Sequence, residues 1–150
     1  MKPLLVLIGS FALSCLVFFE FTHNFDLFLS GRIAMAIMLV FTSVAHFVFY
    51  RGMILMLPKF VPFKKRVVYL TGIIEIAIAI GLIISKTYYM TAFLLIIFFI
   101  LLLPANIIAA KQKINIERAS YGGHGLSYLW FRIPLQLFFI GWVLYFAILH

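Results

Sequence analysis

Five long apolar stretches divide the chain, and they constrain its fold more than any other feature of the sequence. They cover residues 3–21, 31–50, 67–85, 87–110 and 126–149. A helix needs about 20 mostly apolar residues to cross a bilayer. Because backbone polar groups in lipid must be satisfied within their own segment, each stretch is expected to be helical. We therefore predict an all-α, polytopic transmembrane helical bundle with five spans, built as a four-helix core plus an N-terminal helix.

The composition excludes several other classes of protein. Of the 150 residues, 66% are hydrophobic and 11% are charged, whereas soluble domains average about 25% charged residues. The net charge of +8 does not indicate a nucleic-acid partner, because the basic residues lie between apolar runs, where they set topology and contact anionic lipid. The single cysteine, Cys15, excludes an internal disulfide and a redox pair. We predict one transmembrane domain over residues 1–150, in contact with the lipid bilayer.

The first stretch opens the chain, and a cleaved signal peptide is the alternative to a retained helix. Lys2 before an apolar run is typical of a signal, and Ala12 to Cys15 weakly matches a lipoprotein cleavage site. The apolar run continues past Cys15, however, and Ala12 stands where an aliphatic residue is usual. We expect a retained helix.

The basic residues predict the direction of the spans. Five spans place two basic residues on one side, Arg32 and Lys86. The other side holds nine, namely Lys2, Arg51, Lys59, Lys64, Lys65, Arg66, Lys111, Lys113 and Arg118. Because cytoplasmic loops carry an excess of Lys and Arg, this asymmetry predicts a cytoplasmic N-terminus and a C-terminus outside.

Two loops connect the spans on the predicted cytoplasmic side. Loop 51–66 is rich in apolar residues, and Pro58 and Pro62 prevent a continuous helix. We expect this loop to lie in the membrane interface, either as an anchor or as a lid over a site. Loop 111–125 is the most hydrophilic part of the chain, and we expect a cytoplasmic loop with a flexible turn at 122–125.

Six of the polar residues inside the predicted spans stand out, because ionisable and strongly polar groups are costly there and usually face the bundle interior. At a rise of about 1.5 Å per residue, all six fall in the cytoplasmic half of the bilayer. Pro104 and Pro134 are expected to interrupt the two helices beside them. We predict one intramembrane polar site, with no catalytic residue and no metal ligands, formed by His46, Thr71, Glu75, Asn106, Arg132 and Gln136.

Spacing and charge predict how some of these groups meet. Three pairs of these residues are four positions apart, so that each pair shares a helix face, namely Thr42 with His46, Thr71 with Glu75, and Arg132 with Gln136. A buried glutamate needs a nearby cation to stay charged, and Arg132 is the cation embedded in a span. We therefore predict a contact between Glu75 and Arg132. A purely structural pair that holds the helices in register and a snorkelling Arg132 are the alternatives.

Five separated patterns occur in order between about residues 31 and 146. They are Val44-Ala-His46-Phe, Met56-Leu-Pro58-Lys-Phe-Val-Pro62, Val68-Tyr-Leu-Thr71-Gly72-Ile-Ile-Glu75, Leu103-Pro104-Ala-Asn106-Ile and Leu129-Trp-Phe-Arg132-Ile-Pro134-Leu-Gln136. Together they resemble the DoxX-like family of small bacterial integral membrane proteins. The resemblance implies a bacterial inner-membrane location and includes all six residues of the predicted site. Proteins of this wider group are linked to thiosulfate:quinone oxidoreduction, to redox enzyme maturation and to membrane-protein assembly.

Three functions remain open at this point. The first is a non-catalytic subunit or assembly factor of an inner-membrane complex, partnered by a larger membrane protein or by further copies of the chain. The second is a quinone-linked redox component, an oxidoreductase subunit in which Glu75, His46 and Arg132 relay protons or hold the quinone. The third is a small-molecule transporter, although the outer halves of the spans offer few polar residues for a path. We expect the first, with no enzyme activity of its own; no cofactor is evident beyond the possible quinone.

Overall fold

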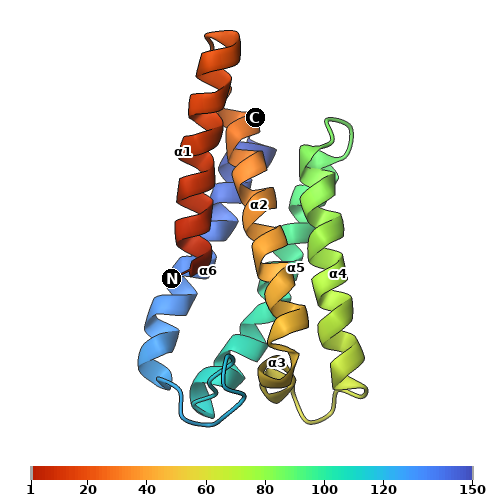
Figure 1. Cartoon of the computed structure of the whole chain (residues 1–150). Coiled ribbons are helices and arrows are strands. Elements are labelled where there is room, and N and C mark those ends of the chain that lie inside the picture. Colours follow the sequence, from red (N-terminus) through yellow and green to blue (C-terminus); the bar gives the residue numbers. More distant parts are fainter. Residues whose placement is uncertain (1, 150) are drawn as a thin grey trace.

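The computed structural model describes residues 2–149, and this part of the chain is helical with no named strand (Figure 1). The predicted all-α fold is confirmed. In chain order the elements are α1 (Lys2–Thr22), α2 (Leu27–Val48), α3 (Tyr50–Met56), α4 (Lys64–Ile83), α5 (Tyr88–Lys111), α6 (Leu126–Val143) and the π-helix η1 (Leu144–Ile148), which continues α6.

Five helices, namely α1, α2, α4, α5 and α6 with η1, are long and apolar enough to cross a membrane. They run alternately up and down in Figure 1, so that their connections fall at two opposite ends of the bundle. This is the architecture of a multi-pass membrane protein.

Helix α2 lies between α1 and α4 and supplies much of the core, while α5 packs against α4 and α6 (Figure 1). The inward face of α2 is fully buried at Ala34 and Leu39. Small residues let α6 and η1 approach α2 closely: a Cβ added at Gly31 would lie 2.3 Å from the Phe146 ring. The indole Nε1 of Trp142 donates a hydrogen bond to the Gly31 carbonyl at 3.0 Å. The Phe146 ring packed against Gly31 and this interhelical hydrogen bond together hold the C-terminal span in place.

Helix α1 is displaced along the bundle relative to its neighbours. Figure 1 shows that α1 starts part-way up the bundle and that its last turns extend beyond the ends of α2 and α4. Lys2, at the start of α1, still contacts the α5–α6 connection through an ion pair with Glu117 at 2.8 Å. One side chain therefore connects the raised end of α1 to the lower end of the molecule.

Local capping accounts for where α2 and α4 begin. Helix α2 starts at Leu27, earlier than the predicted span 31–50, because the Asp26 carboxylate accepts a hydrogen bond from the Leu29 N–H at 3.0 Å and caps the helix. Helix α4 starts at Lys64, directly after Phe63, whose φ of 50° lies in the left-handed region and turns the chain into the helix.

One sequence expectation about irregular backbone is wrong and a second holds in part. Helices α5 and α6 continue through Pro104 and Pro134, because a transmembrane helix tolerates the loss of one backbone donor when its neighbours hold it. The expected loop 51–66 is partly helical, since α3 occupies Tyr50–Met56 before the chain becomes irregular. In the α5–α6 connection, Asn115 and Ser120 form a β-bridge and the Gly123 N–H donates to the Lys113 carbonyl at 2.6 Å, so this connection folds back on itself.

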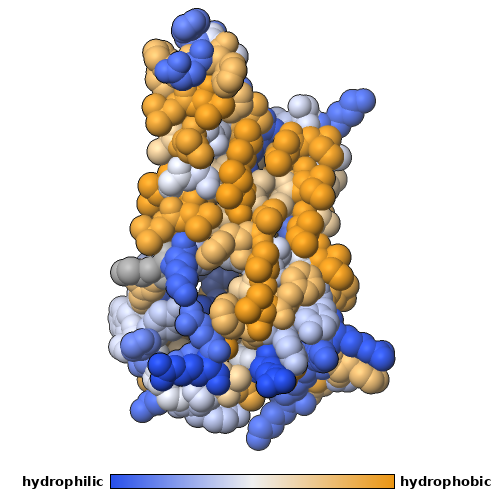
Figure 2. Space-filling model, in the orientation of Figure 1, coloured by the Kyte–Doolittle hydropathy of each residue, from blue (hydrophilic) through white to orange (hydrophobic). Residues whose placement is uncertain are grey.

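The outer surface separates by polarity. Figure 2 shows a broad apolar surface around the middle of the bundle and hydrophilic side chains gathered at the lower end. That end carries α3 and the α5–α6 connection, and we call it the basic end because its two connections, residues 51–66 and 111–125, contain eight of the twelve Lys and Arg residues.

Candidate intramembrane polar site

Two hydrogen-bonded networks inside the bundle contain all six polar residues predicted from the sequence. One joins α2 to α4 and the other joins α5 to α6; within residues 2–149, no hydrogen bond connects the two. We call them the α2–α4 network (Thr42, His46, Thr71 and Glu75) and the α5–α6 network (Phe99, Asn106, Arg132 and Gln136).

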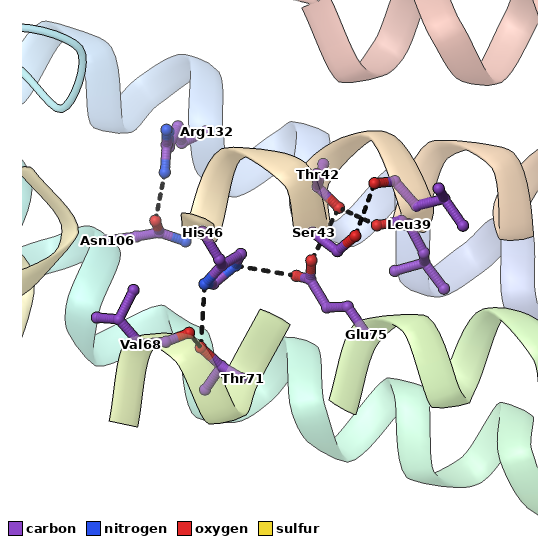
Figure 3. A network of polar contacts seen from close by, with 10 residues as sticks. Leu39, Thr42, Ser43, His46, Val68, Thr71, Glu75, Asn106 and Arg132 are labelled. Carbon is purple, nitrogen blue, oxygen red and sulfur yellow. Dashed lines mark hydrogen bonds and ion pairs between the residues drawn. The ribbon is translucent and has the colours of Figure 1, made fainter. Parts of the chain in front are cut away.

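His46 lies at the centre of the α2–α4 network (Figure 3). Its Nε2 is 3.3 Å from Glu75 Oε1, and its Nδ1 is 3.0 Å from Thr71 Oγ1. The Thr42 hydroxyl donates to the other carboxyl oxygen of Glu75 at 3.1 Å. One helical turn separates the two members on each helix, so the spacing of four residues brings all four side chains to one helix–helix interface.

Close packing of α2 and α4 buries this network. The side chain of Glu75 is 4% exposed and that of His46 is 12% exposed. At Gly72 an added Cβ would lie 2.9 Å from the Cβ of His46, so glycine at this position lets the two helices meet. Burial of polar groups is costly unless they are hydrogen-bonded, and each side chain here has a partner.

The Thr71 hydroxyl and the Glu75 carboxyl contact the two ring nitrogens of His46. The hydroxyl donates to the Val68 carbonyl at 2.7 Å and lies 3.0 Å from Nδ1. Nε2 faces the Glu75 carboxyl. Both nitrogens of this imidazole therefore have a polar partner inside the bundle.

Asn106 lies at the centre of the α5–α6 network. Its side-chain oxygen accepts a hydrogen bond from Arg132 Nη1, and its Nδ2 donates to Gln136 Oε1 at 3.0 Å. Gln136, which is buried, donates in turn to the Phe99 carbonyl. The Arg132 guanidinium also lies 5.0 Å from the centroid of the Tyr128 ring. The three hydrogen bonds join α6 to α5 over about two turns of α5, whereas the contact with Tyr128 lies within α6.

The predicted contact between Glu75 and Arg132 is wrong. Glu75 pairs with His46 on α2, and Arg132 donates to Asn106 on α5. A common depth in the membrane does not determine how each helix is rotated about its axis: α4 turns Glu75 toward α2, and α6 turns Arg132 toward α5. The spacing of four residues did not indicate the correct partner, because Arg132 and Gln136 share it with the pairs that end in His46 and Glu75.

Arg32 is a partly buried cation inside a helix, where the sequence did not place it. Its guanidinium carbon lies 4.0 Å from the centroid of the Tyr88 ring, and its Nε and Nη1 are buried with no hydrogen-bond partner among the described residues. The predicted span began at residue 31 and so placed Arg32 at a flank, whereas the Asp26 cap moves the start of α2 to Leu27 and Arg32 inside the helix. The ring face is therefore the contact that stabilises this charge.

Charged side chains at the basic end are exposed and perturb their neighbours. The hydrogen bond and charge of Lys2 lower the pKa of the Glu117 carboxyl. The hydrogen bond that Arg51 Nε donates to Tyr50 Oη at 3.2 Å, together with the charge of Arg51, lowers the pKa of the Tyr50 phenol. Over residues 2–149, no three His, Cys, Asp or Glu side chains come together in a way that could hold a metal ion.

A family match covers residues 35–147. The chain belongs to the family described as a domain of unknown function, DUF8561. The DUF8561 match begins at Met35, inside α2, and therefore contains every residue of both networks, whereas α1 lies outside it. No curated protein and no solved structure matches the chain.

Proposed function

We propose that this DUF8561 protein is a non-catalytic subunit or assembly factor of an inner-membrane complex. The observation that carries this proposal is the use of the polar side chains inside the spans: they hydrogen-bond from helix to helix and so fix how α2 meets α4 and how α5 meets α6. Apolar packing between membrane helices is weakly specific, so such polar contacts set helix register. A rigid bundle with a broad apolar outer surface suits a protein that packs against a partner in the bilayer.

The sequence supports the membrane location and the orientation that this proposal assumes. The excess of Lys and Arg at the basic end favours a cytoplasmic location for that end, with the N-terminus inside and the C-terminus outside. The resemblance of the five sequence patterns to DoxX-like proteins favours a bacterial inner membrane and an accessory role in a larger complex. Either a larger membrane protein or further copies of the chain would be the partner.

Site-specific photo-crosslinking in native membranes tests the accessory role. A crosslinker at Leu101, which is 69% exposed on α5, is compared with one at Leu95, which is fully buried on the same helix. We expect crosslinks at one exposed face to a single larger membrane protein or to a second copy, and none from Leu95. Crosslinks from every exposed face to lipid alone would refute the proposal.

A quinone-linked redox role is the second candidate, and the buried contact between His46 and Glu75 favours it. The pair lies within one span-to-span interface, with Glu75 Oε1 3.3 Å from His46 Nε2. An imidazole beside a carboxyl can accept a proton that a quinol releases when a redox partner oxidises it to the quinone. Quinone extracted from the gently purified protein, lost in the His46→Leu variant but kept in Ser127→Ala, would support this role; protein free of quinone and of any redox partner would contradict it.

A further inference from the structure

A cleft of about 390 Å³ opens at the basic end. It is lined by residues 48–52, where α2 ends and α3 begins, and by residues 116–119 of the α5–α6 connection. The volume lies within the range of about 300–1,000 Å³ that is usual for small-ligand sites. None of the six predicted site residues lines this cleft.

The walls of the cleft are held in fixed positions. A Cβ added at Gly52 would lie 2.0 Å from the carbonyl oxygen of Ile116, so the backbones of α3 and the α5–α6 connection touch at this glycine. On the other wall, Asn115 pairs with Ser120 through backbone hydrogen bonds, and the Asn115 side chain accepts a hydrogen bond from the Arg118 N–H at 3.1 Å. The cleft is therefore formed by packed and hydrogen-bonded backbone.

Positive charge dominates the lining. Arg51 and Arg118 both line the cleft. Arg51 uses its Nε in the hydrogen bond to Tyr50, which leaves the two terminal nitrogens available, and the Arg118 guanidinium makes no hydrogen bond to any residue between 2 and 149. The one carboxylate of the lining, Glu117, is held by Lys2 at 2.8 Å. Among the described residues, no salt bridge therefore pairs either of these two guanidinium groups with a carboxylate.

We propose that this cleft binds a phosphate group, supplied by the headgroup of an anionic lipid. A planar guanidinium donates two parallel hydrogen bonds to phosphate oxygens, which is why Arg is favoured in phosphate sites. The cleft begins at Val48, the last residue of the α2 span. A headgroup therefore reaches it from the adjacent leaflet without leaving the bilayer surface. This site is independent of the two buried networks and of the accessory role.

Native mass spectrometry of the full-length protein in detergent tests the site. The protein is titrated with phosphatidylglycerol and, separately, with phosphatidylcholine. The double variant Arg51→Gln with Arg118→Gln is compared with Arg66→Gln with Lys111→Gln, which removes the same charge from exposed positions outside the cleft. We expect the cleft variant to retain about tenfold less phosphatidylglycerol than the wild type, equivalent to about 1.4 kcal/mol, and the control to retain nearly as much as the wild type.

Two further measurements make the outcome decisive. Arg118→Lys keeps the charge but loses the planar donor pair, so it should bind less phosphatidylglycerol than the wild type if the phosphate is recognised as proposed. Inorganic phosphate at millimolar concentration is added as a competitor: lipid that stays bound identifies the headgroup as the source, and displacement identifies a free phosphate compound in the same site. Equal loss in the cleft and control variants would mean diffuse attraction to the basic end and would overturn the proposal.

Discussion

Substitutions at Glu75 separate the contributions of shape, hydrogen bonding and charge in the α2–α4 network. Glu75→Leu removes the acceptor of Thr42 and the partner of His46 Nε2. The Thr42 hydroxyl keeps an alternative acceptor, the Leu39 carbonyl at 3.0 Å. The Nε2 of His46 has no other partner among the described residues, so the substitution leaves a buried polar atom unsatisfied.

The expected loss of stability follows from these contacts. A hydrogen bond between transmembrane helices contributes about 0.6 kcal/mol on average, and an unsatisfied buried polar atom costs about 1–3 kcal/mol. Two lost bonds and one unsatisfied nitrogen therefore lower the free energy of unfolding of Glu75→Leu by about 2–4 kcal/mol. Glutamine has nearly the same size, accepts from Thr42 and donates to an unprotonated His46 Nε2, so Glu75→Gln should lose less than about 1 kcal/mol.

Unfolding in mixed detergent micelles, followed by tryptophan fluorescence, measures these differences. A double-mutant cycle with His46→Leu provides the control, because removing both partners leaves neither one unsatisfied. The double variant should be no less stable than Glu75→Leu alone. Equal stability of the Gln and Leu variants, or strictly additive effects of Glu75→Leu and His46→Leu, would refute a stabilising contact between Glu75 and His46.

Three other predictions concern the contacts around the site. Glu117→Gln should melt at a lower temperature than the wild type at any pH above the ordinary pKa of a carboxyl. This difference should disappear as the pH falls through the lowered pKa of Glu117, because protonation breaks its ion pair with Lys2. A difference independent of pH would contradict this. Gly52→Ala should destabilise the protein by about 1–3 kcal/mol through overlap with backbone, whereas Gly122→Ala, whose nearest atom would lie at 4.0 Å, should have little effect on thermal unfolding. Asn106→Leu leaves the guanidinium and the amide that it bridges without their partner and should cost about 1–3 kcal/mol in the same assay; wild-type stability would mean that the bridge does not hold α5 to α6.

Much of the fold and part of the site can be predicted from the sequence, and specific residues show where this prediction fails. The five apolar stretches and the six polar residues within them are visible because length and hydropathy are local properties. The start of α2 was misplaced because one side-chain cap, at Asp26, extends the helix beyond its most apolar part. That error also hid Arg32, whose contact with the Tyr88 ring depends on two helices that are distant in the sequence.

The sequence by itself determined that this chain is a bundle of apolar helices, which side chains are out of place in lipid, and how basic residues are distributed between its ends. These follow from composition and from the fixed rise of a helix. Only the tertiary structure decided the partners: His46 rather than Arg132 for Glu75, Asn106 for Arg132, and a cleft between α3 and the α5–α6 connection. The physical reason is that the depth of a residue in the membrane follows from counting residues along its own helix. The direction in which its side chain faces depends instead on how each helix is rotated to pack against its neighbours.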